Sequence, residues 1–183
     1  MNDTEFQTLV DAHYAALYRF GLSLAKSQSD AADLTQQTFY LWASKGDQLR
    51  DRSKAKSWLF TTLYREFLQR QRREVRFPHV ELEVSQEEPA TVAPNFDQLD
   101  STAVLQALSQ VEEPFRAPLT LFYLEQFSYA EIAAALEVPI GTVMSRLSRG
   151  KNQLRQRLLT LQEMSARNIV PLSKQERDAR HGQ

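Results

Sequence analysis

Residues 128–147 have the sequence SYAEIAAALEVPIGTVMSRL, which predicts two helices joined by a tight turn. Ser128 and Glu131 have the spacing of a capping box, in which each side chain binds an unpaired amide at the start of a helix. Apolar residues then recur at helical spacing until Pro139, and a second apolar stripe begins at Ile140. Short helix, turn and second helix in this order are the pattern of a helix-turn-helix.

The second helix of this pair is basic, because residues 146–158 contain five Lys and Arg and no Asp or Glu. A helix in the major groove of DNA needs short polar side chains near its start and Arg side chains that bind guanine or phosphate. The pattern therefore favours duplex DNA binding, although a charged helix face is more often simply solvated. The predicted outward face holds Thr142, Ser145, Arg146, Arg149 and Asn152, with Lys151 and Arg155 at its flank.

The rest of the chain is predicted to be helical as well. Apolar residues repeat at three- and four-residue intervals over 6–24, 34–42 and 59–67, and again over 104–122. No segment shows the alternating pattern of a strand. We predict an all-α fold in which Ser29 is the N-cap of the second helix and Pro114 opens a helix ahead of the helix-turn-helix.

Residues 77–101 separate two compact parts, since they contain six acidic residues, three Pro and no Lys or Arg. This composition is typical of a flexible linker without a packed core. We therefore predict two small helical domains, at 1–76 and at 102–160, the second containing the helix-turn-helix. The acidic linker joins them, and residues 161–183 form a C-terminal tail.

The first domain carries a basic block of its own, because residues 44–76 contain ten Lys and Arg against four Asp and Glu. Its aromatic and basic side chains suit single-stranded nucleic acid, whose phosphates need cations and whose unstacked bases need a flat surface. At least one of the two residues Trp58 and Phe60 is expected to belong to the core instead. The candidate residues for this role are Lys54, Lys56, Trp58, Thr61, Thr62, Arg65, Arg72 and Arg73.

Several other classes of protein are excluded by composition. The 183 residues include no Cys and three widely separated His, which removes disulfide frameworks and thiolate metal sites. The acidic and His residues form no recognisable acid/base or metal arrangement, so we expect no enzymatic activity, no cofactor and no metal. No apolar run could span a bilayer and the N-terminus lacks the features of a signal peptide, so we expect a cytoplasmic protein without membrane insertion.

Four motifs appear along the chain in a fixed order. They are DAADLTQQTF at residues 30–39, Trp58-Leu59, SYAEIA at residues 128–133 and PIGTVMSRL at residues 139–147. Together they closely resemble the bacterial sigma factors of the extracytoplasmic-function (ECF) group, over about residues 5–158. Because several motifs agree across both domains, the resemblance is more specific than a lone helix-turn-helix.

The resemblance implies an RNA polymerase initiation factor. Its first domain would hold the polymerase clamp through helix 30–42, and would capture the melted −10 promoter element with loop 49–57 and the helix that follows. Its second domain would bind the duplex −35 element with helix 140–155. The implied partners are core RNA polymerase, promoter DNA and an anti-sigma or other regulatory protein. The clamp contacts would be Asp30, Asp33, Gln36, Gln37 and Tyr40.

The sequence departs from the family pattern at three positions. Ala32 stands where an acid is usual, Gln37 where Glu is common, and Met144 where a basic residue is frequent. The missing acids would weaken clamp binding. Phosphorylation of Thr35 or Thr38 is a minority hypothesis for restoring the charge, and control by an anti-sigma protein is the stronger alternative.

Two other functions remain open at this point. The first is a stand-alone helix-turn-helix regulator that binds duplex DNA without polymerase, with residues 1–76 serving as a sensor or dimerisation domain. The second is an interaction protein that sequesters a partner through helix 30–42 and has lost promoter activity. Tight binding of the isolated protein to a duplex operator would favour the first, and failure of transcription with core polymerase would favour the second.

Overall fold

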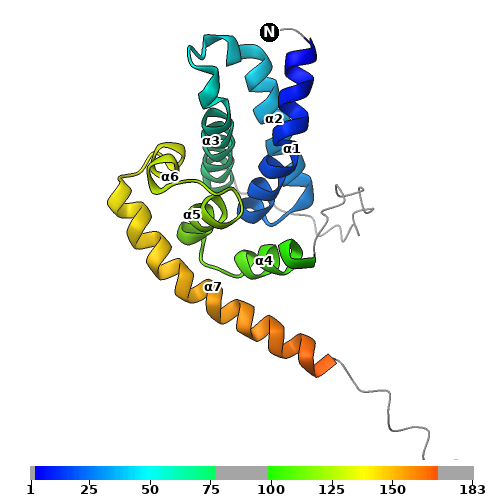
Figure 1. The fold of residues 1–183 in the computed structure, drawn as a ribbon, viewed down its shortest axis with the longest axis vertical. Helices are drawn as coiled ribbons and strands as arrows, with labels where there is room; N and C mark the ends of the chain where they lie inside the picture. The colour runs from blue at the N-terminus through cyan, green and yellow to red at the C-terminus, as the bar shows by residue number, and fades with distance from the viewer. Residues whose placement is uncertain (1–2, 77–98, 169–183) are drawn as a thin grey trace, which may run out of the picture.

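The computed structural model describes residues 3–76 and 99–168, and every regular element within them is helical (Figure 1). The first half consists of α1 (Asp3–Ala25), α2 (Gln28–Lys45) and α3 (Ala55–Arg76). Two 3₁₀ turns, η1 (Gly46–Gln48) and η2 (Arg52–Lys54), connect α2 to α3. The second half consists of α4 (Leu99–Ser109), α5 (Glu113–Tyr123), α6 (Tyr129–Leu136) and α7 (Ile140–Asn168). The predicted all-α fold is confirmed.

The apolar stripes predicted for the first half form the core between α1, α2 and α3. Leu17 and Phe20 from α1, Leu34 from α2 and Leu63 from α3 are completely buried. The predicted N-cap of α2 was wrong by two residues, because the Ser27 hydroxyl accepts the hydrogen bond from the Asp30 N–H at 3.2 Å. Apolar spacing predicts which face of the helix is buried, but it cannot distinguish Ser29 from Ser27 as the residue that caps the helix.

The helix starts predicted in the second half are confirmed. Pro114 lies in the first turn of α5, and the capping box forms as expected at the start of α6. There the Ser128 hydroxyl accepts from the Glu131 N–H at 3.3 Å, while the Glu131 carboxylate accepts from the Ser128 N–H at 2.8 Å. The predicted linker lies mostly outside the described residues, so the domain boundaries stay a prediction. Helix α4 begins at Leu99, and α7 continues to Asn168.

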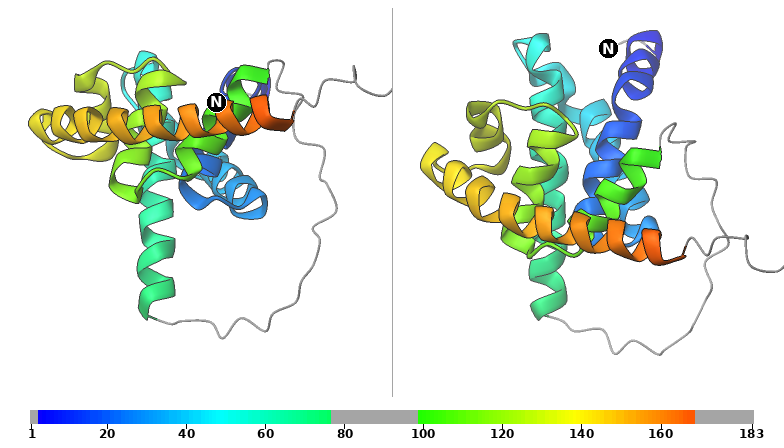
Figure 2. Two further views of the ribbon diagram at one scale, coloured as in Figure 1. Left: turned by 90° about the horizontal axis from the view of Figure 1, so that it is seen from below. Right: turned by 60° about the horizontal axis from the view of Figure 1, so that its bottom comes forward.

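The two halves pack against each other around one continuous core, as the views in Figure 2 also indicate. α1 contacts α4 and α5, and α3 contacts α6. Phe60 of α3 and Phe127, which precedes α6, meet edge to face with their ring centres 5.1 Å apart. The C-terminal end of α3 extends past the neighbouring helices (Figure 2). Sequence periodicity predicted two compact parts but gave no sign of this contact between them.

A buried arginine forms the polar part of the contact between the two halves, which we call the joint. Arg116 of α5 is 7% exposed, and its Nη1 donates hydrogen bonds to the Leu24 carbonyl at 3.0 Å and to the Ser23 carbonyl at 3.3 Å. Both carbonyls belong to the last turn of α1, where the helix dipole favours a cation. The Thr120 hydroxyl adds a hydrogen bond to the Ser23 hydroxyl at 3.0 Å. Arg116 therefore caps a helix of the other half.

Candidate nucleic-acid interface

The start of α7 presents a polar and basic surface to solvent. Ser145, Arg149 and Arg155 are exposed along this helix, as is Lys151, whose ammonium lies 5.9 Å from the centre of the Phe122 ring. Ile140 and Met144 are also exposed, at 50% and 53%. The buried side of the same helix holds Val143, Leu147 and Leu154. An amphipathic helix of this kind can place its outer face in a groove of duplex DNA.

Arg146 was predicted to lie on that outer face, but it is only half-exposed and points toward α3. Burial raises the pKa of the Tyr64 hydroxyl on α3, and the nearby charge of Arg146 together with its hydrogen bond opposes that rise. Thr142 is half-buried as well. The predicted face was therefore too wide, because helical spacing cannot show that one edge of α7 packs beside the first half of the chain.

Gly150 explains how closely α7 approaches α5. A Cβ atom at this position would lie 2.9 Å from both the Leu119 side chain and the Cβ of Phe115. Such distances leave no room for a side chain, and the missing Cβ lets the two helices touch. Gly141, at the start of the same helix, has nothing within 4 Å of its Cβ position.

A concavity of about 440 Å³ lies between the end of α2, η1 and the first turns of α3. Trp58 forms one wall and packs edge to face on Trp42, with ring centres 5.1 Å apart. Trp58 stays half-exposed, whereas Phe60 is fully buried, as expected for one of the two aromatic residues. The lining combines apolar, cationic and hydrogen-bonding groups, namely Leu41, Lys45, Gln48, Leu49, Trp58, Thr62, Arg65 and Glu66.

The predicted single-strand residues of η2 and early α3 differ in their exposure. Lys54 is exposed at the end of η2, 4.0 Å from the Asp51 carboxylate. Thr61 is half-buried and donates its hydroxyl hydrogen to the Ser57 carbonyl at 2.8 Å. Thr62 is 9% exposed, so only a small part of its side chain meets the concavity.

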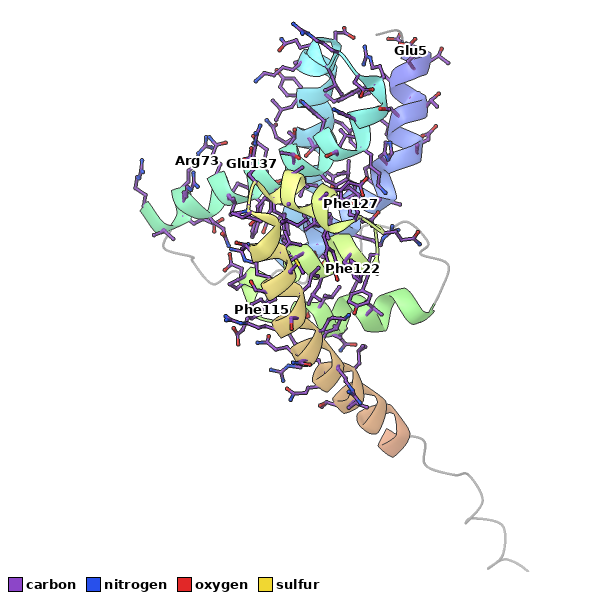
Figure 3. All side chains as sticks on the ribbon, turned by 60° about the vertical axis from the view of Figure 1, so that its left-hand side comes forward. Glu5, Arg73, Phe115, Phe122, Phe127 and Glu137 are labelled. Carbon is purple, nitrogen blue, oxygen red and sulfur yellow. The ribbon has the colours of Figure 1, made fainter. Side chains whose placement is uncertain are left out.

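Two of the predicted cations contact the second half of the chain. Arg65 forms a two-point ion pair with Glu137, with Arg65 Nε 3.1 Å from one carboxylate oxygen and Nη2 paired with the other. Lys56 donates to the Glu125 carbonyl at 3.0 Å and lies 4.7 Å from the centre of the Phe127 ring. Glu137 and Phe127, both labelled in Figure 3, lie in the turns at the two ends of α6.

The remaining cations of α3 lie near its C-terminal end. Arg72 and Arg73 are exposed there, and Figure 3 shows Arg73 on the part of α3 that projects from the body. Since a helix rises about 1.5 Å per residue, this pair is roughly 10 Å or more along the axis from Arg65. The basic surface of α3 therefore extends well beyond the concavity.

The predicted clamp residues occupy the solvent face of α2. Asp30, Asp33 and Gln36 are exposed, Tyr40 is 66% exposed and Gln37 is half-buried. Arg70 of α3 lies 3.6 Å from the Asp30 carboxylate and 3.8 Å from that of Asp33, so it partly neutralises both acids. These exposed side chains are available to a partner protein.

The structure contradicts the phosphorylation hypothesis. Thr35 and Thr38 are both completely buried, and each hydroxyl donates a hydrogen bond to a carbonyl of its own helix, Ala31 and Leu34 respectively, at 2.7 Å. A kinase could reach neither hydroxyl without unfolding α2. Sequence spacing placed both residues beside the polar face, but it could not show that they turn inward.

Sequence reasoning missed three charged residues of the joint: Arg116, Glu125 and Glu137. Glu125 is 6% exposed and pairs with Arg19 of α1 at 3.0 Å. Glu137 ends α6 in the left-handed conformation, with φ of 55°, and its ion pair with Arg65 lowers the pKa of its carboxyl. A turn residue ahead of Pro139 was visible in the sequence, but its partner 72 positions away was not.

No three His, Asp or Glu side chains in 3–76 and 99–168 gather closely enough to hold a metal ion. Over the same residues, no helix combines the length and the apolarity that crossing a bilayer requires.

Comparisons with known proteins agree with this arrangement. The family described as sigma-70 region 2 matches residues 9–77, and the family described as sigma-70 region 4 matches residues 101–154. The two matches correspond to the first and second halves of the structure. Their order is the one that the motifs indicated.

Individual relatives belong to the same group. The ECF RNA polymerase sigma factor SigL of Mycobacterium tuberculosis is 33% identical over 162 residues, which cover 86% of this chain and 89% of SigL. SigE of Mycolicibacterium smegmatis, also an ECF RNA polymerase sigma factor, is 37% identical over 152 residues, and the match spans 80% of this chain and 59% of SigE.

Solved structures show the same fold. The sigma factor RpoE of Bartonella quintana, in complex with the anti-sigma factor NepR, matches with a TM-score of 0.69 and 31% identity, over 84% of this chain and 96% of RpoE. CnrH, in complex with the cytosolic domain of CnrY, shares the fold with a TM-score of 0.60 at 22% identity. With both sigma-70 regions in order and relatives matched over most of their length, the chain belongs to the ECF RNA polymerase sigma factors.

Proposed function

We propose that this protein binds core RNA polymerase and directs transcription from promoters whose −10 and −35 elements it recognises. The observation that carries the proposal is the presence of both sigma-70 regions on one chain, each with an exposed basic surface. A stand-alone regulator needs only the duplex-binding half. A helix-turn-helix joined to a second basic unit that suits single strands fits a protein that holds DNA at two places.

The outer face of α7 is the proposed reader of the −35 duplex. Ser145 and Arg149 lie centrally on the exposed face, where short and bidentate side chains can reach base edges. Lys151 and Arg155 flank it and suit phosphate contacts, which add affinity without sequence preference. Met144 offers an apolar contact, such as one to a thymine methyl group, where a cation is absent.

The concavity at the start of α3 is the proposed site for the melted −10 element. Trp58 supplies a flat surface for a base, and base stacking on an aromatic side chain contributes about 1–3 kcal/mol. The Glu66 carboxylate and the Thr62 hydroxyl can hydrogen-bond a base edge. Lys45 and Arg65 at the same site can neutralise phosphates on either side. Lys54, Lys56 and the Arg72 and Arg73 pair extend this basic path.

The solvent face of α2 is the proposed contact with the polymerase clamp. It carries Asp30, Asp33, Gln36, Gln37 and Tyr40. Two acids and an exposed tyrosine fit a basic partner surface with an apolar patch. Since RpoE and CnrH were solved with partner proteins, we also propose an anti-sigma-type regulator for this chain. We place the protein in the cytoplasm and assign it no enzymatic activity.

Transcription in vitro tests the proposed function. Core polymerase lacking any sigma factor is supplied with this protein and a library of promoter fragments, and the transcripts are sequenced. The proposal predicts discrete start sites that share −10 and −35 sequences and that require the protein. Tight binding of the protein alone to duplex DNA, with no transcription on addition of core polymerase, would favour the stand-alone regulator.

A further inference from the structure

We propose that the second half of the chain masks the single-strand site of the first half while leaving the duplex-binding face of α7 open. The key residue is Glu137, whose carboxylate binds the Arg65 guanidinium where a DNA phosphate would otherwise bind. This inference rests on the proposed function, since it assigns Arg65 to single-stranded DNA. It adds that the packing of the second half on the first covers the −10 site while the −35 site stays accessible.

Masking is visible in the contacts of the predicted DNA residues. Arg65 lines the concavity and is held by both carboxylate oxygens of Glu137. Lys56 is held by the Glu125 carbonyl and the Phe127 ring. Both contacts come from the turns that flank α6, and each engages a cation of α3, Arg65 or Lys56. A DNA strand that follows α3 would have to displace them.

The outer face of α7 shows the opposite situation. Ser145, Arg149 and Arg155 remain exposed while α6 rests on α3. Two of the predicted −35 residues, Thr142 and Arg146, are half-buried, and Arg146 lies near Tyr64 of α3. The packing of α6 and α7 beside α3 therefore covers one edge of the −35 face but leaves its centre exposed.

The chemistry of the Arg65 and Glu137 pair makes it a reversible mask. A guanidinium binds a carboxylate and a phosphate through the same parallel pair of N–H donors, so the two anions compete for one site. The Arg65 and Glu137 side chains are 60% and 53% exposed, so solvent and DNA can both reach the pair. Exposed pairs of this kind are weak, which lets an incoming strand or a polymerase contact open the mask.

Removal of the Glu137 charge provides the test. The Glu137→Gln variant keeps the size and the left-handed backbone of the turn but loses the ion pair. We expect its affinity for a fluorescent pool of random single-stranded 20-mers to rise about fivefold, the scale of an exposed ion pair. Affinity for the duplex form of the same pool is expected to change less than twofold, both measured by anisotropy.

Two controls separate masking from a general gain of positive charge. Glu112→Gln changes the net charge equally, but Glu112 is paired with Gln153 inside the second half, so no gain in single-strand binding is expected. In the Arg65→Ala background, adding Glu137→Gln should also produce no gain, because the mask acts through Arg65. Equal gains for the single-stranded and duplex pools, or a gain that persists without Arg65, would overturn the proposal.

A readout without DNA follows the opening itself. The chain contains no Cys, so Ser44→Cys on α2 and Ser148→Cys on α7 allow clean labelling of two exposed positions for energy transfer. Glu137→Lys, which places two cations together, should lower the transfer efficiency, and Glu112→Lys should not. Unchanged single-strand binding by Glu137→Gln in a protein that supports transcription would reject the mask alone. Loss of transcription in every form of the protein would reject the proposed function.

Discussion

The Arg116 guanidinium of α5 lies 3.0 Å from the carbonyl oxygen of Leu24, at the C-terminal end of α1. This hydrogen bond joins two segments that are 92 positions apart in the sequence. Burial lowers the pKa of Arg116, but not enough to remove the charge of a guanidinium. Arg116 is thus a buried cation whose hydrogen bonds go to helix carbonyls, while the charge of the Glu113 carboxylate partly offsets the cost of burial.

Truncation of this side chain is expected to destabilise the whole protein. Arg116→Ala removes charged hydrogen bonds and leaves a cavity, which should lower the free energy of unfolding by roughly 2–4 kcal/mol. Arg157→Ala, on the exposed part of α7, should change it by less than about 0.5 kcal/mol. Urea unfolding measures both values. Equal effects of the two substitutions would show that Arg116 contributes no more than a surface arginine.

The contrast between Gly150 and Gly141 yields a second prediction. Alanine in a helix is favoured over glycine by about 1 kcal/mol, so Gly141→Ala, with open space around it, should be neutral or stabilising by up to that amount. Gly150→Ala should instead destabilise by about 1–3 kcal/mol, because its methyl group would overlap Phe115 and Leu119. Thermal unfolding of the two variants distinguishes them. A stabilised Gly150→Ala protein would mean that α5 and α7 separate easily.

Most of the fold could be predicted from the sequence, and the joint could not. The capping box at Ser128 and the helix start at Pro114 depend on residues a few positions apart, so local spacing reveals them. Arg116 and Glu137 have partners far along the chain, so local spacing shows neither the burial of Arg116 nor the ion pair of Glu137. The same limitation explains why Thr35 and Arg146 were expected to be more exposed than they are.

The −35 face should divide its work between two kinds of residue. Arg149→Ala is expected to weaken binding by about 1–3 kcal/mol and to relax the preference at one base position. Lys151→Ala should weaken all sequences alike and reduce the dependence of log K on log salt by about one unit. Binding to a −35 duplex library at several salt concentrations measures both effects. A uniform loss for both variants would reject this division.

Added acids on α2 should strengthen polymerase binding. Ala32 and Gln37 are half-buried beside the exposed Asp33 and Gln36, and glutamates there would increase the negative charge offered to a basic clamp. The double variant Ala32→Glu/Gln37→Glu is expected to bind core polymerase about three- to tenfold more tightly, a gain that salt should reduce. Ala43→Glu, near the other end of the helix, serves as the control for added charge. Equal affinity for core polymerase in the unsubstituted protein, the double variant and Ala43→Glu would show that missing acids on α2 do not limit binding.

The stability of the joint should depend on pH through His13. Burial lowers the pKa of His13 below its ordinary value of 6.5, the charge of Lys56 lowers it further, and Glu125 opposes the change. As pH falls through 6.5, the unfolded chain takes up a proton that the folded protein resists, so stability is lost toward acid pH. We expect a lower free energy of unfolding at pH 5.5 than at pH 7.5, and a smaller difference for His13→Gln. An identical pH dependence in the variant would contradict this role.

Promoter melting tests the central claim most directly. A promoter selected by transcription is probed with permanganate, which modifies unpaired thymines, in the presence of this protein, of core polymerase, or of both. The account predicts reactive thymines at the −10 element only when both are present, and their loss on Arg65→Ala in a folded protein that still binds core polymerase. Normal melting with Arg65→Ala would contradict the placement of the −10 site. Absence of melting with both components would contradict the assignment of promoter-directing activity to this chain.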